Sequence, residues 1–158
     1  MIIDIHGHYT TGLKALEDWR NRQIAGLKDP SVAPKASELK ISDDELRESI
    51  EKNQLAKMKE RGSDLTVFSP RASFMAHHIG DFDTSSTWAA ICNELCYRVS
   101  RLFPEHFIGA AMLPQSPGVD PKTCIPELEK CVNEYGFVAI NLNPDPSGGH
   151  WTSPPLSD

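Results

Sequence analysis

The stretch Met1-Ile2-Ile3-Asp4-Ile5-His6-Gly7-His8-Tyr9 decides how this chain is interpreted. Its apolar start predicts a β-strand over Ile2–Ile5, with two histidines delivered at the carboxyl end of that strand. Because side chains alternate along a strand, Asp4, His6 and His8 are expected on one face. Neutral imidazole is a common metal ligand, and two imidazoles one residue apart can reach a single ion. His6 and His8 are therefore the predicted metal ligands, and the alternative is a pair of surface histidines.

The composition is that of a single globular domain. The 158 residues are 39% hydrophobic and 24% charged, and the formal net charge is −6. An acidic chain of this kind does not favour nucleic acid or an anionic membrane surface as a partner. No apolar run approaches the ~18 residues of a membrane span. The expected location is the cytoplasm, where the four cysteines would be reduced core residues on helix stripes: Cys92, Cys96, Cys124 and Cys131.

Apolar runs predict four β-strands, and helical patterns separate them. The runs are apolar throughout, which is typical of parallel strands covered on both faces. One helix is predicted to open with a capping box, Ser42-x-x-Glu45, and to stop at Gly62. The predicted strands are Ile2–Ile5, Leu65–Phe68, Phe107–Met112 and Phe137–Leu142, and the predicted helices are Leu13–Leu27, Ser42–Arg61, a segment from Thr84 to Phe103, and one from Asp120 to Gly136.

The alternation of strand and helix predicts the α/β class, with a parallel sheet and right-handed crossovers. Four such units, without a helix after the fourth strand, correspond to the N-terminal half of a (β/α)8 TIM barrel, whose usual length is ~250 residues. We therefore expect residues 1–158 to be the N-terminal part of one barrel domain within a longer polypeptide. The alternative is a complete small α/β domain that binds a metal or ligand without turnover.

Three segments together carry a family resemblance: Asp4-Ile5-His6-Gly7-His8, Phe103-Pro104-Glu105-His106-Phe107-Ile108-Gly109-Ala110, and Gly136-Phe137-Val138-Ala139-Ile140-Asn141-Leu142. They resemble the amidohydrolase superfamily, in the branch that contains aminocarboxymuconate semialdehyde decarboxylase. The resemblance implies a (β/α)8 barrel with its site at the carboxyl ends of the strands. It also implies a divalent metal, usually zinc, held by His6 and His8 together with ligands from later strands.

The same resemblance implies a reaction. Within the branch, the chain is similar to hydratases of bacterial protocatechuate and gallate breakdown, which act in the catabolism of lignin-derived aromatics. Such a lyase adds water to the carbon–carbon double bond of an unsaturated tricarboxylic keto acid. The expected partner is therefore a small di- or tricarboxylate keto acid, and the full-length enzyme is expected to be a homo-oligomer. Decarboxylation and hydrolysis are the alternatives, because one fold and metal serve several chemistries.

Three further residues are predicted site residues, because they follow strands at the catalytic edge. Arg71 follows the second strand, and its guanidinium can fork onto a substrate carboxylate, although it could also be a surface arginine. His77, in the same loop, is the predicted catalytic residue, which would move a proton or bind a carboxylate; the alternative is a solvated loop residue. Asn141 could bind a substrate oxygen, although Asn is also a common turn former at strand ends.

Overall fold

Four parallel strands form the sheet of the computed structural model, which describes residues 1–10, 12–71 and 76–143. They are β1 (Ile3–Tyr9), β2 (Leu65–Pro70), β3 (Phe107–Met112) and β4 (Ala139–Asn141), and they lie side by side in chain order. This is the order of consecutive strands in a (β/α)8 barrel. The predicted α/β class and the parallel half-barrel are confirmed.

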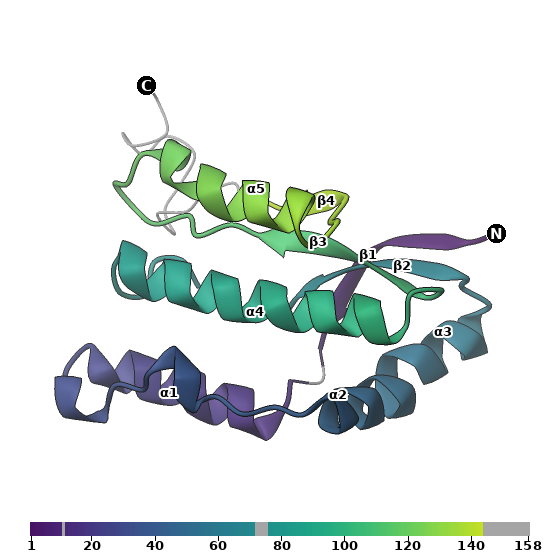
Figure 1. Cartoon of the computed structure of the whole chain (residues 1–158), viewed down its shortest axis with the longest axis horizontal. Helices are drawn as coiled ribbons and strands as arrows, with labels where there is room; N and C mark the ends of the chain where they lie inside the picture. Colours follow the sequence, from purple (N-terminus) through teal and green to yellow (C-terminus); the bar gives the residue numbers. More distant parts are fainter. Residues whose placement is uncertain (11, 72–75, 144–158) are drawn as a thin grey trace.

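Helices fill the connections between the strands (Figure 1). Helix α4 packs on β2 and β3, and α2 packs against α4 from the side away from the sheet. The α-helices are α1 (Lys14–Gly26), α2 (Asp43–Ile50), α3 (Ala56–Arg61), α4 (Phe82–Leu102) and α5 (Ile125–Asn133). Short 3-10 turns lie at η1 (Pro30–Val32), η2 (Ala36–Glu38) and η5 (Pro121–Cys124), and a π turn, η3 (Glu51–Leu55), joins α2 to α3.

Local capping interactions explain where two of these helices begin and end. The Ser42 hydroxyl accepts a hydrogen bond from the Glu45 backbone N–H, and the Glu45 carboxylate accepts one from the Ser42 N–H, so the predicted capping box is present. Gly62 ends the α2–η3–α3 run with a φ of 69°. Helix α4 begins before the predicted Thr84, because Asp81 Oδ1 accepts from the Thr84 N–H at 2.8 Å and caps the helix.

Three strands differ in length from their predicted ranges, and β2 continues past Phe68 to Pro70. Strand β1 continues past Ile5 to Tyr9, because its second half pairs with the end of β2. Strand β4 is shorter than predicted, because only three residues pair with β3. Phe137, just before β4, instead packs over Gly109, where a Cβ atom would lie 2.1 Å from the Phe137 ring.

A β-bulge in β1 changes which side chains share a face. Asp4 pairs with Thr66, and His8 pairs with Ser69, so β1 has one residue more than β2 across this interval. Paired residues point to the same face, whereas Thr66 and Ser69, three positions apart, point to opposite faces. By this register Asp4 and His8 point to opposite faces. Asp4 nevertheless lines the same cleft as His6 and His8, and its Oδ1 accepts from the His6 backbone N–H at 3.0 Å.

The core lies between the sheet and the helices around α4. Trp19 and Trp88 stack in it with ring centroids 6.1 Å apart. The four cysteines are buried and free, as predicted: Cys92, Cys96, Cys124 and Cys131. Burial raises the pKa of each thiol, so these groups stay protonated and act as small apolar side chains. The described helices include none with the length and apolar character that a bilayer crossing requires.

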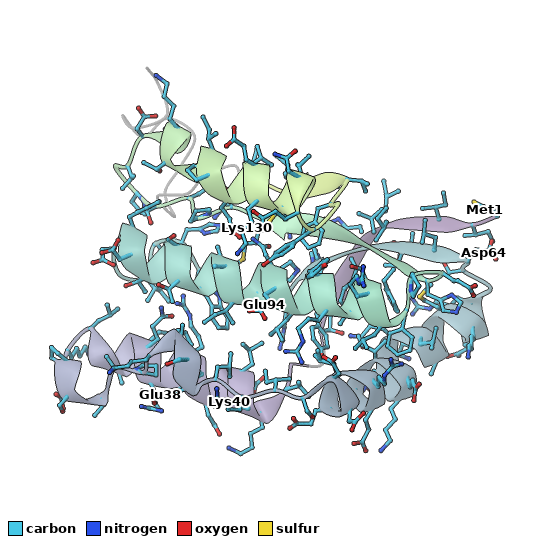
Figure 2. All side chains as sticks on the ribbon, viewed as in Figure 1. Met1, Glu38, Lys40, Asp64, Glu94 and Lys130 are labelled. Atoms are coloured by element: carbon cyan, nitrogen blue, oxygen red, sulfur yellow. The ribbon has the colours of Figure 1, made fainter. Side chains whose placement is uncertain are left out.

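Strand β1, at one edge of the sheet, is held at its start by the chain terminus. At the start of β1, the Met1 ammonium group lies 3.7 Å from the Asp64 carboxylate, which also accepts from the Ile2 N–H (Figure 2). Strands β1 and β4 form the two open edges. Large apolar side chains are exposed along both of them: Ile3, Ile5, Val138, Ile140 and Leu142.

Candidate active site

The imidazoles of His6 and His8 meet near the carboxyl end of β1. Their Nε2 atoms lie 2.9 Å apart, and the two rings are perpendicular with centroids 4.6 Å apart. Two nitrogens that each lie ~2.0–2.1 Å from one ion are separated by roughly 3 Å. The expected convergence of the two rings is observed, and the pair fits a shared metal ion.

The hydrogen bonds of His8 determine which ring nitrogen is available to a metal. Its Nδ1 lies 3.0 Å from the carbonyl oxygen of Pro70 and 2.7 Å from Oγ of Ser69. A carbonyl oxygen can only accept, so Nδ1 carries the proton and Nε2 of the neutral ring keeps its lone pair. Metal-binding histidines are commonly held in this way, with the second nitrogen donating to a carbonyl group. The tautomer of His8 therefore suits metal binding.

Ser69 connects His8 to Asn141, the residue of β4 that is predicted to bind substrate. The Ser69 hydroxyl lies 2.7 Å from His8 Nδ1 and 3.5 Å from Nδ2 of Asn141. The fold thus brings Asn141 into the neighbourhood of the histidine pair. Ser69 was not predicted as a site residue, because its role depends on the pairing of β2 with β1 and on the approach of β4.

Arg71 follows the carboxyl end of β2, on the same side of the sheet as the histidine pair in the strand direction, but it lines a different hollow. It borders a narrow crevice together with Tyr9, Leu16 and Cys92, between β1, α1 and α4. A separate cleft of about 240 Å³ lies between β1, β2 and the α2–α3 run, and His6 and His8 are among the residues that line it. The substrate-binding role of Arg71 remains a prediction.

His77 is buried, so the alternative of a solvated loop residue is wrong. Its side chain is 2% exposed, and Nε2 has no hydrogen-bond partner among the described residues. Burial above all, together with the positive charges of His78 and Arg20, lowers the pKa of His77 to about 4. His77 is consequently neutral at pH 7. Its catalytic role remains a prediction.

A complete set of metal ligands is not present in the described part of the chain. Within residues 1–10, 12–71 and 76–143, no group of three or more His, Cys, Asp or Glu side chains could hold a metal ion. Catalytic zinc sites normally have three protein ligands and an open position. The histidine pair alone falls short of such a ligand set.

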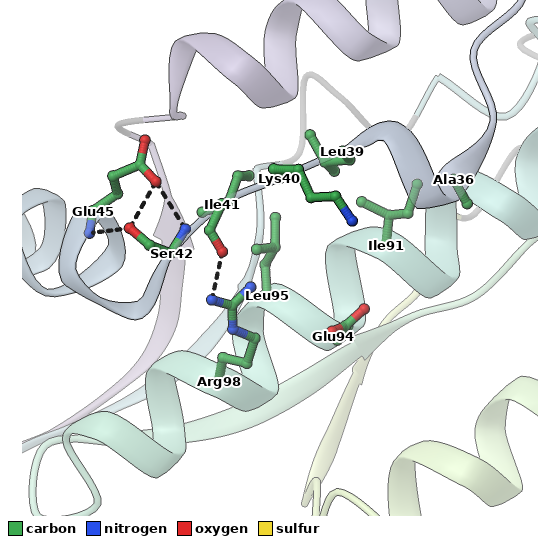
Figure 3. Close-up of a pocket in the computed structure, with 10 residues that line it drawn as sticks. All are labelled: Ala36, Leu39, Lys40, Ile41, Ser42, Glu45, Ile91, Glu94, Leu95 and Arg98. Carbon is green, nitrogen blue, oxygen red and sulfur yellow. Dashed lines mark hydrogen bonds between the residues drawn. The ribbon is translucent and has the colours of Figure 1, made fainter.

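A larger groove of about 460 Å³ runs between α4 and the segment before α2 (Figure 3). Arg98 donates to the Ile41 carbonyl oxygen at 2.7 Å and to the Asp43 carboxylate at 2.6 Å. Ser42 and Glu45 bond to one another at its end, as the capping box. The Arg98 charge is thus already paired, and we place no catalytic function in this groove.

Residues 3–158 match the model of the Amidohydrolase family, and the chain belongs to this family. Over its whole length the chain is 84% identical in sequence to 4-oxalomesaconate hydratase from Rhodopseudomonas palustris. The crystal structure of that protein matches with a TM-score of 0.91, and the match covers 46% of that chain. It is 58% identical over 158 residues to the 2-keto-4-carboxy-3-hexenedioate hydratase of a Sphingobium species, covering 100% of this chain and 46% of that relative.

A more remote relative is a decarboxylase. The dihydroxybenzoic acid decarboxylase of a Polaromonas species, solved with bound manganese and the inhibitor 2-nitroresorcinol, is 26% identical. Its TM-score is 0.55, and the match covers 90% of this chain and 38% of that one. In all three comparisons the chain spans about half the length of the relative or less.

Proposed function

We propose that these residues are the N-terminal part of a metal-dependent hydratase. The enzyme adds water to the carbon–carbon double bond of an unsaturated tricarboxylic keto acid of the 4-oxalomesaconate type, in the catabolism of lignin-derived aromatics. Identities of 84% and 58% to two hydratases support the reaction. The observation that carries the site is the 2.9 Å separation of the Nε2 atoms of His6 and His8.

The proposed cofactor is a divalent metal, with zinc as the first candidate. His6 and His8 would supply two imidazole ligands, which suit zinc and several other divalent metals. Bound there, the ion would lower the pKa of a water molecule or polarise a substrate oxygen. Manganese is the second candidate, since the related decarboxylase structure contains it.

Three other residues have proposed roles around the substrate. Arg71, beyond the end of β2, would bind one carboxylate through its guanidinium fork. The Asn141 amide would bind a substrate oxygen near the histidine pair, since it already reaches Ser69. His77, neutral at pH 7, would move a proton or bind a carboxylate through its imidazole.

The test uses the full-length protein. Wild type is expected to consume 4-oxalomesaconate with loss of the absorbance of the conjugated double bond, and to contain a divalent metal by elemental analysis. His6→Ala and His8→Ala should lose both the metal and the activity. His106→Gln is the matched control, because His106 precedes β3 at the opposite edge of the sheet and should leave both unchanged. Release of carbon dioxide without hydration would instead favour the decarboxylase alternative.

The location and assembly of the whole protein are also proposals. The acidic composition and the buried free cysteines support a cytoplasmic protein. A homo-oligomer is proposed for the full-length enzyme. Light scattering coupled to gel filtration measures its mass directly, and a monomeric mass at micromolar concentration would contradict this proposal.

A further inference from the structure

Ser69 is a buried residue of β2 whose hydroxyl group contacts two other strands. Its side chain is 5% exposed. We propose that Ser69 is a positioning residue, which orients His8 for metal binding and ties Asn141 to the same point. This inference rests on the proposed metal-dependent function. It adds a residue that links the metal ligand His8 to Asn141, whose amide is proposed to bind substrate.

The hydrogen-bonding capacity of the Ser69 hydroxyl is fully used. A hydroxyl group has one proton to donate and two lone pairs that accept. The proton has an acceptor in the Gly7 carbonyl oxygen at 3.1 Å, which is nearer than the Pro70 carbonyl oxygen at 3.4 Å. The lone pairs accept from His8 Nδ1–H at 2.7 Å and from the Asn141 amide at 3.5 Å. Because each partner takes a different part of the hydroxyl, all three can be satisfied at once.

The contact with His8 affects the ring that would bind the metal. Nδ1–H is shared between the Ser69 hydroxyl and the Pro70 carbonyl oxygen, so two acceptors on β2 restrain the rotation of the imidazole. A restrained ring holds the Nε2 lone pair toward His6 before any ion arrives. Loss of such a supporting hydrogen bond typically weakens metal affinity 10- to 100-fold.

The contact with Asn141 is longer and crosses the sheet. Asn141 lies on β4, two strands away from β2 in the sheet order. Its amide reaches Ser69 on the same face as His8, since Ser69 is the residue that pairs with His8. A displacement of Ser69 would therefore disturb two parts of the proposed site, the metal ligand His8 and the substrate-binding amide of Asn141.

The experiment measures metal affinity of the full-length protein by competition with a chelator, using Zn²⁺ and Mn²⁺ as probes. Ser69→Ala should bind the metal about 10- to 100-fold more weakly, whereas Ser69→Thr, which keeps the hydroxyl, should stay close to wild type. Ser116→Ala is the matched control. Ser116 is 7% exposed, and its hydroxyl is buried without a hydrogen-bond partner among the described residues, so its removal should leave metal affinity unchanged.

Nitrogen-15 NMR of the metal-free protein provides a second measurement. Wild type should show His8 with its proton on Nδ1. In Ser69→Ala only the Pro70 carbonyl oxygen remains as acceptor, so a larger share of the Nε2-protonated tautomer is expected. Ser69→Cys, with a weaker acceptor, is expected to be intermediate and is the fallback if the Ala variant does not fold. Equal metal affinity in wild type and Ser69→Ala, or an equal loss in Ser116→Ala, would overturn the proposal. If wild type binds no metal, the proposed function fails, while the tautomer measurement still decides the role of Ser69.

Discussion

Gln115 holds the backbone of Asn143 with both ends of its side-chain amide. Nε2 donates to the Asn143 carbonyl oxygen at 2.9 Å, and Oε1 accepts from the Asn143 N–H at 2.8 Å. The backbone pairing of β3 with β4 ends where Met112 lies opposite Asn141. The Gln115 side chain thus continues this pairing two residues further and keeps the end of β4 against β3.

Removal of the Gln115 amide should loosen the end of β4. We expect Gln115→Ala and Gln115→Glu each to lower the free energy of unfolding by about 1–2 kcal/mol, because the Asn143 carbonyl loses its donor in both variants. Urea unfolding of the full-length protein gives this value, and hydrogen exchange at the Asn143 amide reports the local opening. The KM for substrate should rise if Asn141 binds substrate. Wild-type exchange at Asn143 in the Ala variant would contradict this prediction.

Asn93 should be more sensitive to substitution than any exposed asparagine. It is fully buried in α4, accepts from the Met112 N–H at 2.8 Å, and donates to the Met112 carbonyl at 2.9 Å and to Glu127 at 2.7 Å. Asn93→Leu leaves these groups unpaired and should cost roughly 2–4 kcal/mol of stability. Asn93→Asp should cost more at neutral pH than at acid pH, because its carboxylate would face Glu127. The exposed Asn133→Ala is the control, and an equal loss of stability there would refute the argument.

The burial of His77 predicts a specific dependence of stability on pH. The pKa of His77 is about 4 in the folded protein and about 6.5 in the unfolded chain. Between these values the unfolded chain binds a proton that the folded protein does not, so the free energy of unfolding decreases as the pH falls from about 6.5 to about 4. His77→Gln should flatten the curve of Tm against pH over this range. The exposed His78→Gln should retain the wild-type slope, and identical slopes in wild type and His77→Gln would show that the premise is incorrect.

A polypeptide of residues 1–158 alone should associate and bind metal weakly. Exposed apolar side chains on two open strand edges favour self-association, and the described residues offer a metal no set of three ligands beside the histidine pair. We therefore expect concentration-dependent oligomers in gel filtration, weak zinc binding and no hydratase activity. Ile140→Lys should reduce the association without changing metal binding. A monomeric, cooperatively folded and active 1–158 polypeptide with stoichiometric zinc would support the alternative of a complete small domain.

Much of the fold could be predicted because its signals are local in sequence. The capping box of Ser42 and Glu45 lies within four residues, and the structure contains it at the predicted place. Gly136 likewise has a φ of 69° directly after the last predicted helix. Such signals depend only on the conformations of neighbouring residues, so the sequence expresses them directly. The strand order follows from the alternation of strand and helix.

The missed features depend on contacts between segments far apart in the chain. The bulge in β1 exists only relative to β2, and no residue type at Asp4 marks it. The role of Ser69 requires both the β1–β2 pairing and the approach of Asn141. The burial of His77 depends on tertiary packing, whereas the sequence shows only two adjacent histidines. Prediction therefore identified the histidine pair and left its supporting residues undetected.

Because of its bulge, β1 has one residue more than β2 between two strand pairings. Asp4 is held opposite Thr66, and His8 is held opposite Ser69, with four steps along β1 against three along β2. Deletion of Ile5, which is 79% exposed, would equalise the two counts. A bulge bends and twists its strand locally, and in β1 the bend lies between Asp4 and Gly7, an interval that contains His6. The extra residue therefore changes the shape of β1 at the histidine pair.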